Sequence, residues 1–260
     1  MTILDKIIVK KKVEVEQAKV ISTIANLEAM PLFERSCLSL HDSIHHTERN
    51  GIIAEYKRAS PSKGIINDRS SVAEVVVGYE AAGASAVSVL TDREFFGGSL
   101  NDLVAARAEL HIPLLRKEFI IDAYQLVEAK AHGADIILLI AAVLDSKQVQ
   151  ALSEFAQSLG LNVLLEVHNR EELERSMVDS VDAIGVNNRN LKDFSVSLDH
   201  SLELVDLIPD RFIKVSESGI SDPETIRQLR QAGFQGFLIG ENFMKTGDPA
   251  QAIREFVNLL

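Results

Sequence analysis

Short apolar runs alternate with longer amphipathic or alanine-rich stretches from residue 50 to the end of the chain. The short runs predict β-strands, because buried parallel strands are brief and continuously apolar. They lie at 51–57, 86–91, 113–117, 135–140, 162–167, 183–187, 212–216 and 236–239. The longer stretches have the spacing of α-helices. They lie at 71–82, 100–110, 122–132, 146–159, 170–177, 198–207, 223–232 and 249–259.

This alternation predicts the α/β class, with eight strand–helix units closed into a (β/α)8 TIM barrel. Such a barrel typically needs about 250 residues, and the chain has 260. Gly83, Gly133 and Gly233 follow three of the helices and predict left-handed C-caps before the next strand. A doubly wound open sheet is the alternative, but no Gly-x-Gly-x-x-Gly turn follows the first strand.

Residues 1–47 lie outside the alternation and predict a helical extension packed on a barrel of residues 48–260, the whole forming a single domain. Pro31 suits the start of a second helix in this extension, which we expect over 32–40. Apolar residues recur at helical spacing among lysines and glutamates at its beginning: Leu4, Ile7, Ile8 and Val15.

The composition, with 46% hydrophobic and 25% charged residues, is that of a soluble globular protein. A net charge of −11 argues against sequence-independent binding of nucleic acid, although a local basic cluster can still bind a small anion. Cys37 is the single cysteine, so no disulfide framework or cysteine metal site is expected. The N-terminus lacks a signal-peptide core and no apolar run reaches membrane-spanning length, so we expect a cytoplasmic protein.

Polar side chains follow the apolar part of several predicted strands. In the first strand, Glu55 and Lys57 share a face with Ile53, because strand side chains alternate between faces. The other polar strand ends are 91–93, 116–118, Glu166, Asn187 with Arg189, and Glu217. The carboxyl ends of barrel strands meet at one mouth, so we expect lysines and glutamates to converge there and shift each other's pKa values.

This set of residues favours acid–base chemistry by lysine and glutamate. It lacks an Asp/His cluster with metal-ligand spacing, so we expect no metal ion. His41 and His45 have such a spacing, but we expect both at the surface. His168, two residues after Glu166, is expected to be a solvated loop residue. Desolvation of a strand-end lysine such as Lys117 is expected to lower its pKa to roughly 7–8, a range suited to general acid catalysis.

Glycine-bearing loops follow the last two predicted strands, at 216–220 and 238–242. Ser221 or Asp222 caps the helix after the first of these loops, and Pro223 suits its first position. Loops in these strand positions, near a helix N-terminus, form the usual phosphate site of such barrels. The sequence therefore predicts a small phosphorylated substrate.

These strand-end motifs resemble those of the indole-3-glycerol phosphate synthase family along the whole chain. They lie at 54–64, 90–99, 115–122, 164–168, 184–191, 216–220 and 238–244. The resemblance implies ring closure of 1-(2-carboxyphenylamino)-1-deoxyribulose 5-phosphate to indole-3-glycerol phosphate, with release of CO2 and water and without a cofactor. No second barrel follows, so we expect the monofunctional form. The sequence does not show an association with other enzymes of tryptophan biosynthesis.

The resemblance also implies roles for individual residues. Lys117 would be the general acid that protonates the ribulose carbonyl, and Glu166 the acid/base of the later dehydration. Lys57 would hold anionic groups and donate a proton in dehydration. Glu55, Asn187 and Glu217 would complete the polar ring. Further binding residues would be Ser60, Arg189 and Leu238, then Phe119 and Leu138 as an apolar wall, and Ser218, Gly219, Gly240 and Glu241 at the phosphate. Many members have Ser or Thr in place of Glu241, whose carboxylate cannot donate to a phosphate.

Two other functions stay open at this stage. A lysine at a barrel strand end can also form a Schiff base, which would make the protein an aldolase. A non-catalytic phosphate-ligand binder is the second alternative, and the presence of both Lys117 and Glu166 argues against it. In the enzymatic reading, the 57–64 loop could close over the substrate.

Overall fold

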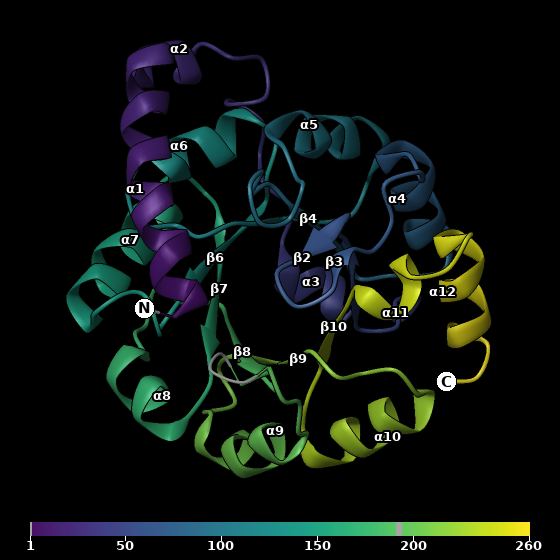
Figure 1. Ribbon diagram of the computed structural model, residues 1–260. Coiled ribbons are helices and arrows are strands. Elements are labelled where there is room, and N and C mark those ends of the chain that lie inside the picture. Colours follow the sequence, from purple (N-terminus) through teal and green to yellow (C-terminus); the bar gives the residue numbers. More distant parts are fainter. Residues whose placement is uncertain (1, 191–193) are drawn as a thin grey trace.

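The computed structural model describes residues 2–190 and 194–260, and within them eight parallel strands form a closed barrel (Figure 1). The strands are β1 (Ile52–Tyr56), β4 (Ala86–Leu90), β5 (Leu114–Lys117), β6 (Ile136–Ile140), β7 (Asn162–Val167), β8 (Ala183–Asn187), β9 (Ile213–Glu217) and β10 (Gly236–Ile239). Each pairs with its neighbours in sequence, and β1 pairs with β10 to close the ring. The predicted fold class is confirmed.

Helices surround the barrel, each following a strand (Figure 1). They are α4 (Val72–Ala81), α5 (Leu100–Glu109), α6 (Tyr124–Ala131), α7 (Ser146–Ser158), α8 (Arg170–Ser176), α9 (Asp199–Leu204) with the 3-10 turn η1 (Val205–Leu207), α10 (Pro223–Ala232) and α12 (Pro249–Val257). Gly83, Gly133 and Gly233 all have positive φ, as the predicted C-caps require. Within the described residues, no helix is long and apolar enough to cross a membrane.

Three short elements at the mouth were not predicted. The strands β2 (Ala59–Ser60) and β3 (Gly64–Ile65) form an antiparallel hairpin within the loop after β1. The helix α11 (Glu241–Met244) follows β10 directly. Elements of two to four residues carry too little periodicity to be recognised in a sequence.

The N-terminal extension consists of α1 (Ile3–Ile21), α2 (Ile24–Glu28) and α3 (Leu40–Ile44). The predicted helix over 32–40 is wrong, because that stretch forms a turn and then an extended segment. The hydroxyl of Ser39 accepts a hydrogen bond from Asp42 N and so caps α3 at its observed start. The division of the chain at residue 47 stays a prediction.

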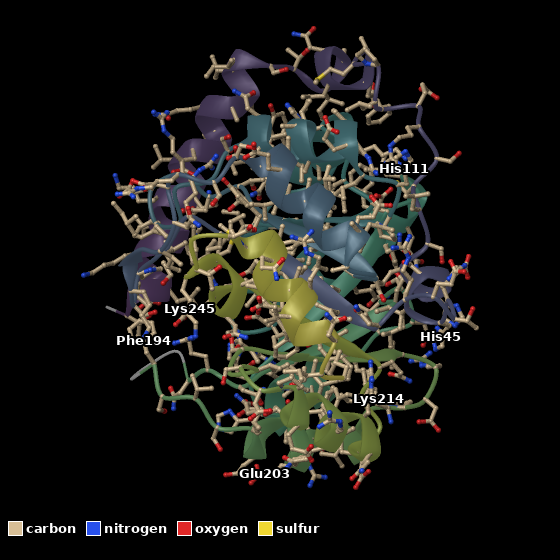
Figure 2. The ribbon with its side chains drawn as sticks, turned by 90° about the vertical axis from the view of Figure 1, so that its right-hand side faces the viewer. His45, His111, Phe194, Glu203, Lys214 and Lys245 are labelled. Carbon is tan, nitrogen blue, oxygen red and sulfur yellow. The ribbon has the colours of Figure 1, made fainter. Side chains whose placement is uncertain are left out.

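The helix α3 closes the end of the barrel opposite the mouth. Leu40 and Ile44 are buried and pack into the barrel's apolar interior beside Ile53 and Leu115. In the side view of Figure 2, His45 at the end of α3 lies at one end of the molecule, and Phe194 and Lys245 lie at the other. The strand ends that carry the charged residues therefore face the Phe194 end.

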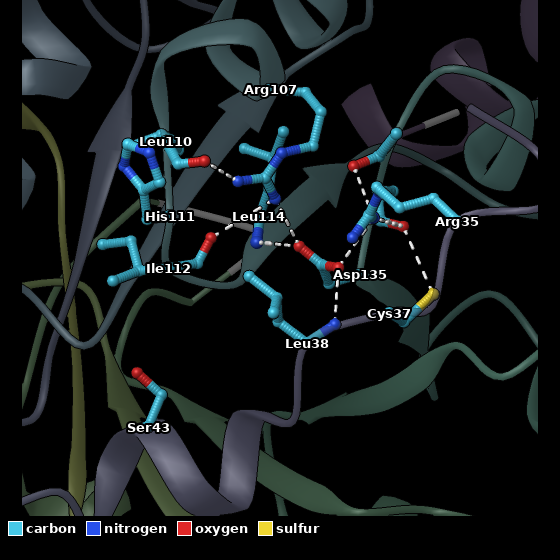
Figure 3. A network of polar contacts seen from close by, with 12 residues as sticks. Arg35, Cys37, Leu38, Ser43, Arg107, Leu110, His111, Ile112, Leu114 and Asp135 are labelled. Atoms are coloured by element: carbon cyan, nitrogen blue, oxygen red, sulfur yellow. Dashed lines mark hydrogen bonds and ion pairs between the residues drawn. The ribbon is translucent and has the colours of Figure 1, made fainter. Parts of the chain in front are cut away.

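A buried carboxylate fastens the extension to the barrel (Figure 3). Asp135, at the start of β6, is fully buried and accepts four hydrogen bonds. Its Oδ1 atom receives Arg35 Nη2 and Leu38 N, both at 2.7 Å. Its Oδ2 atom receives Arg107 Nη1 at 2.7 Å and Leu114 N at 2.9 Å. One residue thus joins the extension, α5 and β5.

Charged residues near two of the strand ends also bind the surrounding helices. Arg116 points outward, where its Nη2 atom lies 2.7 Å from Glu128 of α6. Lys11 of α1 is buried, with its Nζ atom 2.9 Å from Asp92 and 3.0 Å from Glu118. Arg116 points away from the mouth because side chains alternate along a strand and the next residue, Lys117, points into it.

Candidate active site

All of the site residues predicted from the sequence line one cavity of about 640 Å3 at the mouth of the barrel. They are Glu55, Lys57, Ser60, Lys117, Phe119, Leu138, Glu166, Asn187, Arg189, Glu217, Ser218, Gly219, Leu238, Gly240 and Glu241. The motif at 184–191 ends in Leu191, which lies outside the described residues. The predicted site residues share one cavity because the barrel brings together strand ends that are distant in the sequence.

Lys117 lies at the centre of the charged part of the cavity. Its Nζ atom donates to Glu217 Oε2 at 2.7 Å and to Glu166 Oε2 at 3.0 Å. A second pair lies on β1 and the loop after it, where Lys57 Nζ is 2.7 Å from Glu55 Oε1. All five side chains are less than a fifth exposed. Charges so poorly hydrated interact more strongly than surface pairs.

The position of Glu217 depends on a missing side chain in the next strand. A Cβ atom at Gly185 would lie 2.1 Å from Glu217 Oε1. Gly185 therefore leaves the space in which the Glu217 carboxylate lies beside β8. The Oε1 atom is buried and makes no hydrogen bond to any described residue, so one lone-pair face of this carboxylate stays free.

Burial and the neighbouring carboxylates shift the pKa of Lys117 in opposite directions. Burial disfavours its charge, but Glu217, Glu166 and Glu55 together outweigh burial and raise the pKa. The expected lowering to the range of 7–8 is therefore wrong for the free protein. The sequence showed the desolvation but not how many carboxylates surround this amine.

The two carboxylates bound to Lys117 behave differently. Burial, with the charges of Glu166 and Glu55, raises the pKa of Glu217 to about 7 against the attraction of Lys117. In Glu166, burial is outweighed by Lys117, His168 and hydrogen bonds from Lys117 and Asn187, so its pKa is lowered. Two neighbouring carboxylates with separated pKa values are the pattern of an acid–base pair. Glu166 is the charged member near neutral pH.

His168 does not lie in solvent, contrary to the prediction. Its side chain is 9% exposed and lies between two carboxylates. The Nε2 atom is 3.4 Å from Glu166 Oε1, and the Nδ1 atom is 3.2 Å from Glu172 Oε2. Glu172, on the first turn of α8, also accepts the backbone N–H of His168 at 2.8 Å. The helix after β7 thus folds the ring back against the barrel.

The opposite side of the cavity is formed by the glycine loops after β9 and β10. Ser218 and Gly219 both have positive φ, at 67° and 78°, so this loop turns sharply at the cavity wall. A Cβ atom at Gly240 would lie 2.5 Å from Glu55 Oε1. Glu241 begins α11, and its carboxylate lies 3.7 Å from both Arg189 and Lys63. Its side chain pairs with cations, so at Glu241 the backbone N–H is the group that suits an anion.

Comparisons with known proteins agree with this geometry. The family model described as indole-3-glycerol phosphate synthase matches residues 4–256. A protein of that name from Bacteroides thetaiotaomicron is 47% identical over 258 residues, covering 99% of this chain and 98% of its own. Another from a Polaromonas species is 43% identical over 260 residues, covering 99% and 98%.

The chain belongs to the indole-3-glycerol phosphate synthase family.

Solved structures with far lower identity share the family's barrel. The chain matches 3-hexulose-6-phosphate synthase from Salmonella typhimurium with a TM-score of 0.63 at 14% identity, covering 81% of this chain and 98% of that one. It matches a chain of the tryptophan synthase complex from Pyrococcus furiosus with a TM-score of 0.62 at 16% identity, covering 82% and 98%. At such identity these matches concern the fold alone.

In this member of the indole-3-glycerol phosphate synthase family, the extension also contributes to the cavity. Ile3, Leu4 and Ile7 of α1 line it, as do Phe96 and Phe119, whose ring centroids lie 6.0 Å apart. Sequence reasoning missed the α1 residues as site residues. Their helical spacing was visible, but the spacing does not tell which surface a helix covers.

Proposed function

We propose that this cavity closes the indole ring of 1-(2-carboxyphenylamino)-1-deoxyribulose 5-phosphate by general acid–base catalysis. Family membership makes the chain a decarboxylating lyase of tryptophan biosynthesis that acts on a small phosphorylated substrate. The observation that carries the proposed mechanism is the contact of Lys117 with both Glu217 and Glu166 inside the cavity. A cytoplasmic location and an association with other enzymes of the pathway stay predictions.

Lys117 protonates the ribulose carbonyl as the aromatic carbon attacks it. Its raised pKa keeps the amine protonated in the free protein, so the proton donor is ready when substrate binds. The substrate oxygen then replaces a carboxylate as a partner of Nζ, which makes the amine a stronger acid than in the free protein. Loss of CO2 needs no electron-accepting cofactor, because the iminium formed by ring attack takes up the electrons.

The later dehydration uses Glu166 and Lys57. Glu166 is ionised and takes the proton that leaves the ring as the hydroxyl departs. Lys57, held by Glu55, binds the anionic groups of the substrate and assists the departure of the hydroxyl as water. Asn187 hydrogen-bonds to Glu166 and orients it.

The two ends of the substrate fit the two sides of the cavity. Phe119, Leu138 and the α1 residues form an apolar wall for the anthranilate ring. Ser218, Gly219 and Gly240 lie on the opposite side, where backbone N–H groups and Arg189 suit the phosphate. Glu241 contributes its backbone N–H there. Ser60 and Leu238 complete the contacts between these ends.

Turnover by the purified protein tests this function. With the carboxyphenylamino-deoxyribulose phosphate as substrate and a chelator present, we expect indole fluorescence to appear together with CO2. Borohydride added during turnover separates this mechanism from an aldolase, since only a Schiff base would leave a stable adduct on Lys117. Absence of indole product, or such an adduct, would contradict the proposal.

The raised pKa of Glu217 predicts a pH dependence of substrate binding. As the pH rises through about 7, Glu217 ionises and adds a negative charge beside an anionic substrate. We expect KM to rise by roughly tenfold, the equivalent of one pKa unit of interaction. In the Glu217→Gln variant the substrate phosphate still titrates, but residue 217 does not ionise. The KM of this variant should therefore change with pH only as the phosphate titrates. Parallel KM profiles for the two proteins would contradict the prediction.

A further inference from the structure

Lys11 is a buried cation of α1 that the mechanism above does not use. Its side chain is 5% exposed, and its Nζ atom contacts Asp92 after β4 and Glu118 after β5, both of which are also buried. A third carboxylate, the partly exposed Glu14, lies 2.6 Å from the same atom. Burial opposes the charge of Lys11, but Glu118 and Asp92 outweigh burial and raise its pKa. The charged amine therefore joins α1 to the ends of two barrel strands.

The two buried carboxylates also bind the backbone of loops that carry aromatic residues of the cavity. Asp92 Oδ1 accepts the N–H of Phe95 at 2.8 Å, next to Phe96. Glu118 Oε1 accepts the N–H of Phe119 at 2.8 Å. Phe96 and Phe119 both line the cavity. Each carboxylate thus contacts the ammonium of α1 and the backbone at or beside a cavity-lining ring.

The helix α1 brings its own apolar side chains into the cavity from the face that carries Lys11. Ile3 and Ile7 line the cavity and precede Lys11 by two turns and one turn of the helix. Residues four apart share a helix face, so these side chains form one row with Lys11. Val15 extends the row and packs in an apolar cluster with Tyr124 of α6. Lys11 is the charged member of this otherwise apolar row.

A buried ion pair is a poor means of adding stability alone. Replacing such a pair with apolar residues of similar volume is often neutral or stabilising, because both charges lose their hydration. Apolar contacts have no preferred direction, however, whereas an ammonium between two buried carboxylates has fixed partners. Lys11 therefore fixes where α1 lies relative to the loops after β4 and β5.

We propose that Lys11 is a positioning residue that sets the apolar wall for the aromatic ring of the substrate. This proposal rests on the proposed function, which assigns that wall to the anthranilate ring. Without the ammonium, α1 stays attached through its apolar face. Ile3 and Ile7 then lose their fixed position relative to Phe96 and Phe119, so the ring end of the substrate binds less tightly. The glycine loops after β9 and β10, at the phosphate end, keep their contacts.

The test measures two ligands by calorimetric titration of the full-length Lys11→Met variant. Methionine keeps much of the length of the lysine stem and suits the apolar row, but it cannot bind a carboxylate. Indole-3-glycerol phosphate has an aromatic ring, and glycerol 3-phosphate has only the phosphate end. We expect the dissociation constant of the first to rise roughly tenfold, the lower end of what one misfitted methylene costs in an apolar pocket, and that of the second to stay within about twofold.

Steady-state kinetics separates positioning from loss of the fold. KM for the substrate should rise in Lys11→Met while kcat stays within about twofold, because the lost contact serves ground state and transition state alike. Thr91 still donates to Glu118 at 2.8 Å in this variant, so β5 should keep Lys117 in place. A general destabilisation would instead lower the amount of active protein and leave KM unchanged.

Asp92→Asn tests the same contact from the barrel side. Its Oδ1 atom can still accept the N–H of Phe95, but an NH2 group replaces the oxygen that faces Lys11. We expect the same selective loss for the ring-bearing ligand, of smaller size. Lys10→Met is the matched control, since Lys10 contacts Glu94 from the same helix but has a side chain that is 56% exposed. It should bind both ligands as wild type does.

An equal loss for the two ligands in Lys11→Met, or no loss for either, overturns the proposal. Where that variant fails to fold, a wild-type ratio of the two dissociation constants in Asp92→Asn overturns it. The same selective loss in Lys10→Met would overturn it as well, because an exposed pair cannot fix the wall. A wild-type protein that makes no indole product refutes the proposed function instead.

Discussion

Replacing Lys117 with methionine is expected to lower kcat by about 10²–10⁴-fold, the contribution of a positioned general acid. Methionine keeps the length and much of the volume of the lysine stem but cannot donate a proton. The buried carboxylates of Glu166 and Glu217 lose the cation that now contacts both. They can take up a proton instead, so the fold should persist. Steady-state production of indole fluorescence measures the loss.

The exposed Lys147 of α7 provides a matched control, because Lys147→Met makes the same chemical change away from the cavity. Its kcat and its thermal unfolding should equal those of wild type. A Lys117→Met protein that unfolds at the wild-type temperature but does not turn over supports the general-acid role. Turnover at the wild-type rate would exclude that role.

The predicted site residues line one cavity because of two simple rules of the barrel. Strand ends share one mouth, and alternation along each strand decides which residues point into it. Glu55, Lys117, Glu166 and Glu217 all follow that rule and meet in the cavity. No long-range contact had to be known in advance, since the order of strands in this fold is the order of the sequence.

The errors arose where a side chain depends on a neighbour that the sequence does not reveal. His168 has the parity of Glu166, but its burial depends on α8, whose Glu172 holds the ring from one turn away. The pKa of Lys117 depends on how many carboxylates surround its amine, and reasoning from desolvation alone gave the wrong direction. Counting charged residues at strand ends predicts neither the burial of His168 nor the direction of the Lys117 pKa shift.

The extension shows the same limit at a larger scale. Its first helix was expected, but neither its contribution to the cavity wall nor the extended stretch after Pro31 was. That stretch is fixed by Asp135, which binds Arg35 and Leu38 from about a hundred residues further along the chain. A distant buried acceptor thus overrides local helical preference, as tertiary contacts often do.

Replacing Asp135 with asparagine is expected to lower the free energy of unfolding by about 3–5 kcal/mol, the cost of breaking a buried ion pair by removing one partner. The carboxylate is fully buried and accepts four hydrogen bonds, two from the arginines 35 and 107. An asparagine has one acceptor oxygen, and its NH2 group would face two of the four donors. Both guanidinium groups would also lose their counter-charge.

Urea unfolding followed by circular dichroism measures this loss, with Asp179→Asn as the matched control. Asp179 pairs with Arg211 at the surface, where its side chain is 88% exposed, so its replacement should leave the unfolding midpoint nearly unchanged. Asp135 contacts both the extension and the barrel, so its loss should also expose residues 35–38 to proteolysis below the midpoint. Equal midpoints for Asp135→Asn and Asp179→Asn would contradict the assigned role. Since Asp135 lies at the end of β6 opposite the mouth, kcat at low temperature should change far less than stability, which separates this fastening from the chemistry of Lys117.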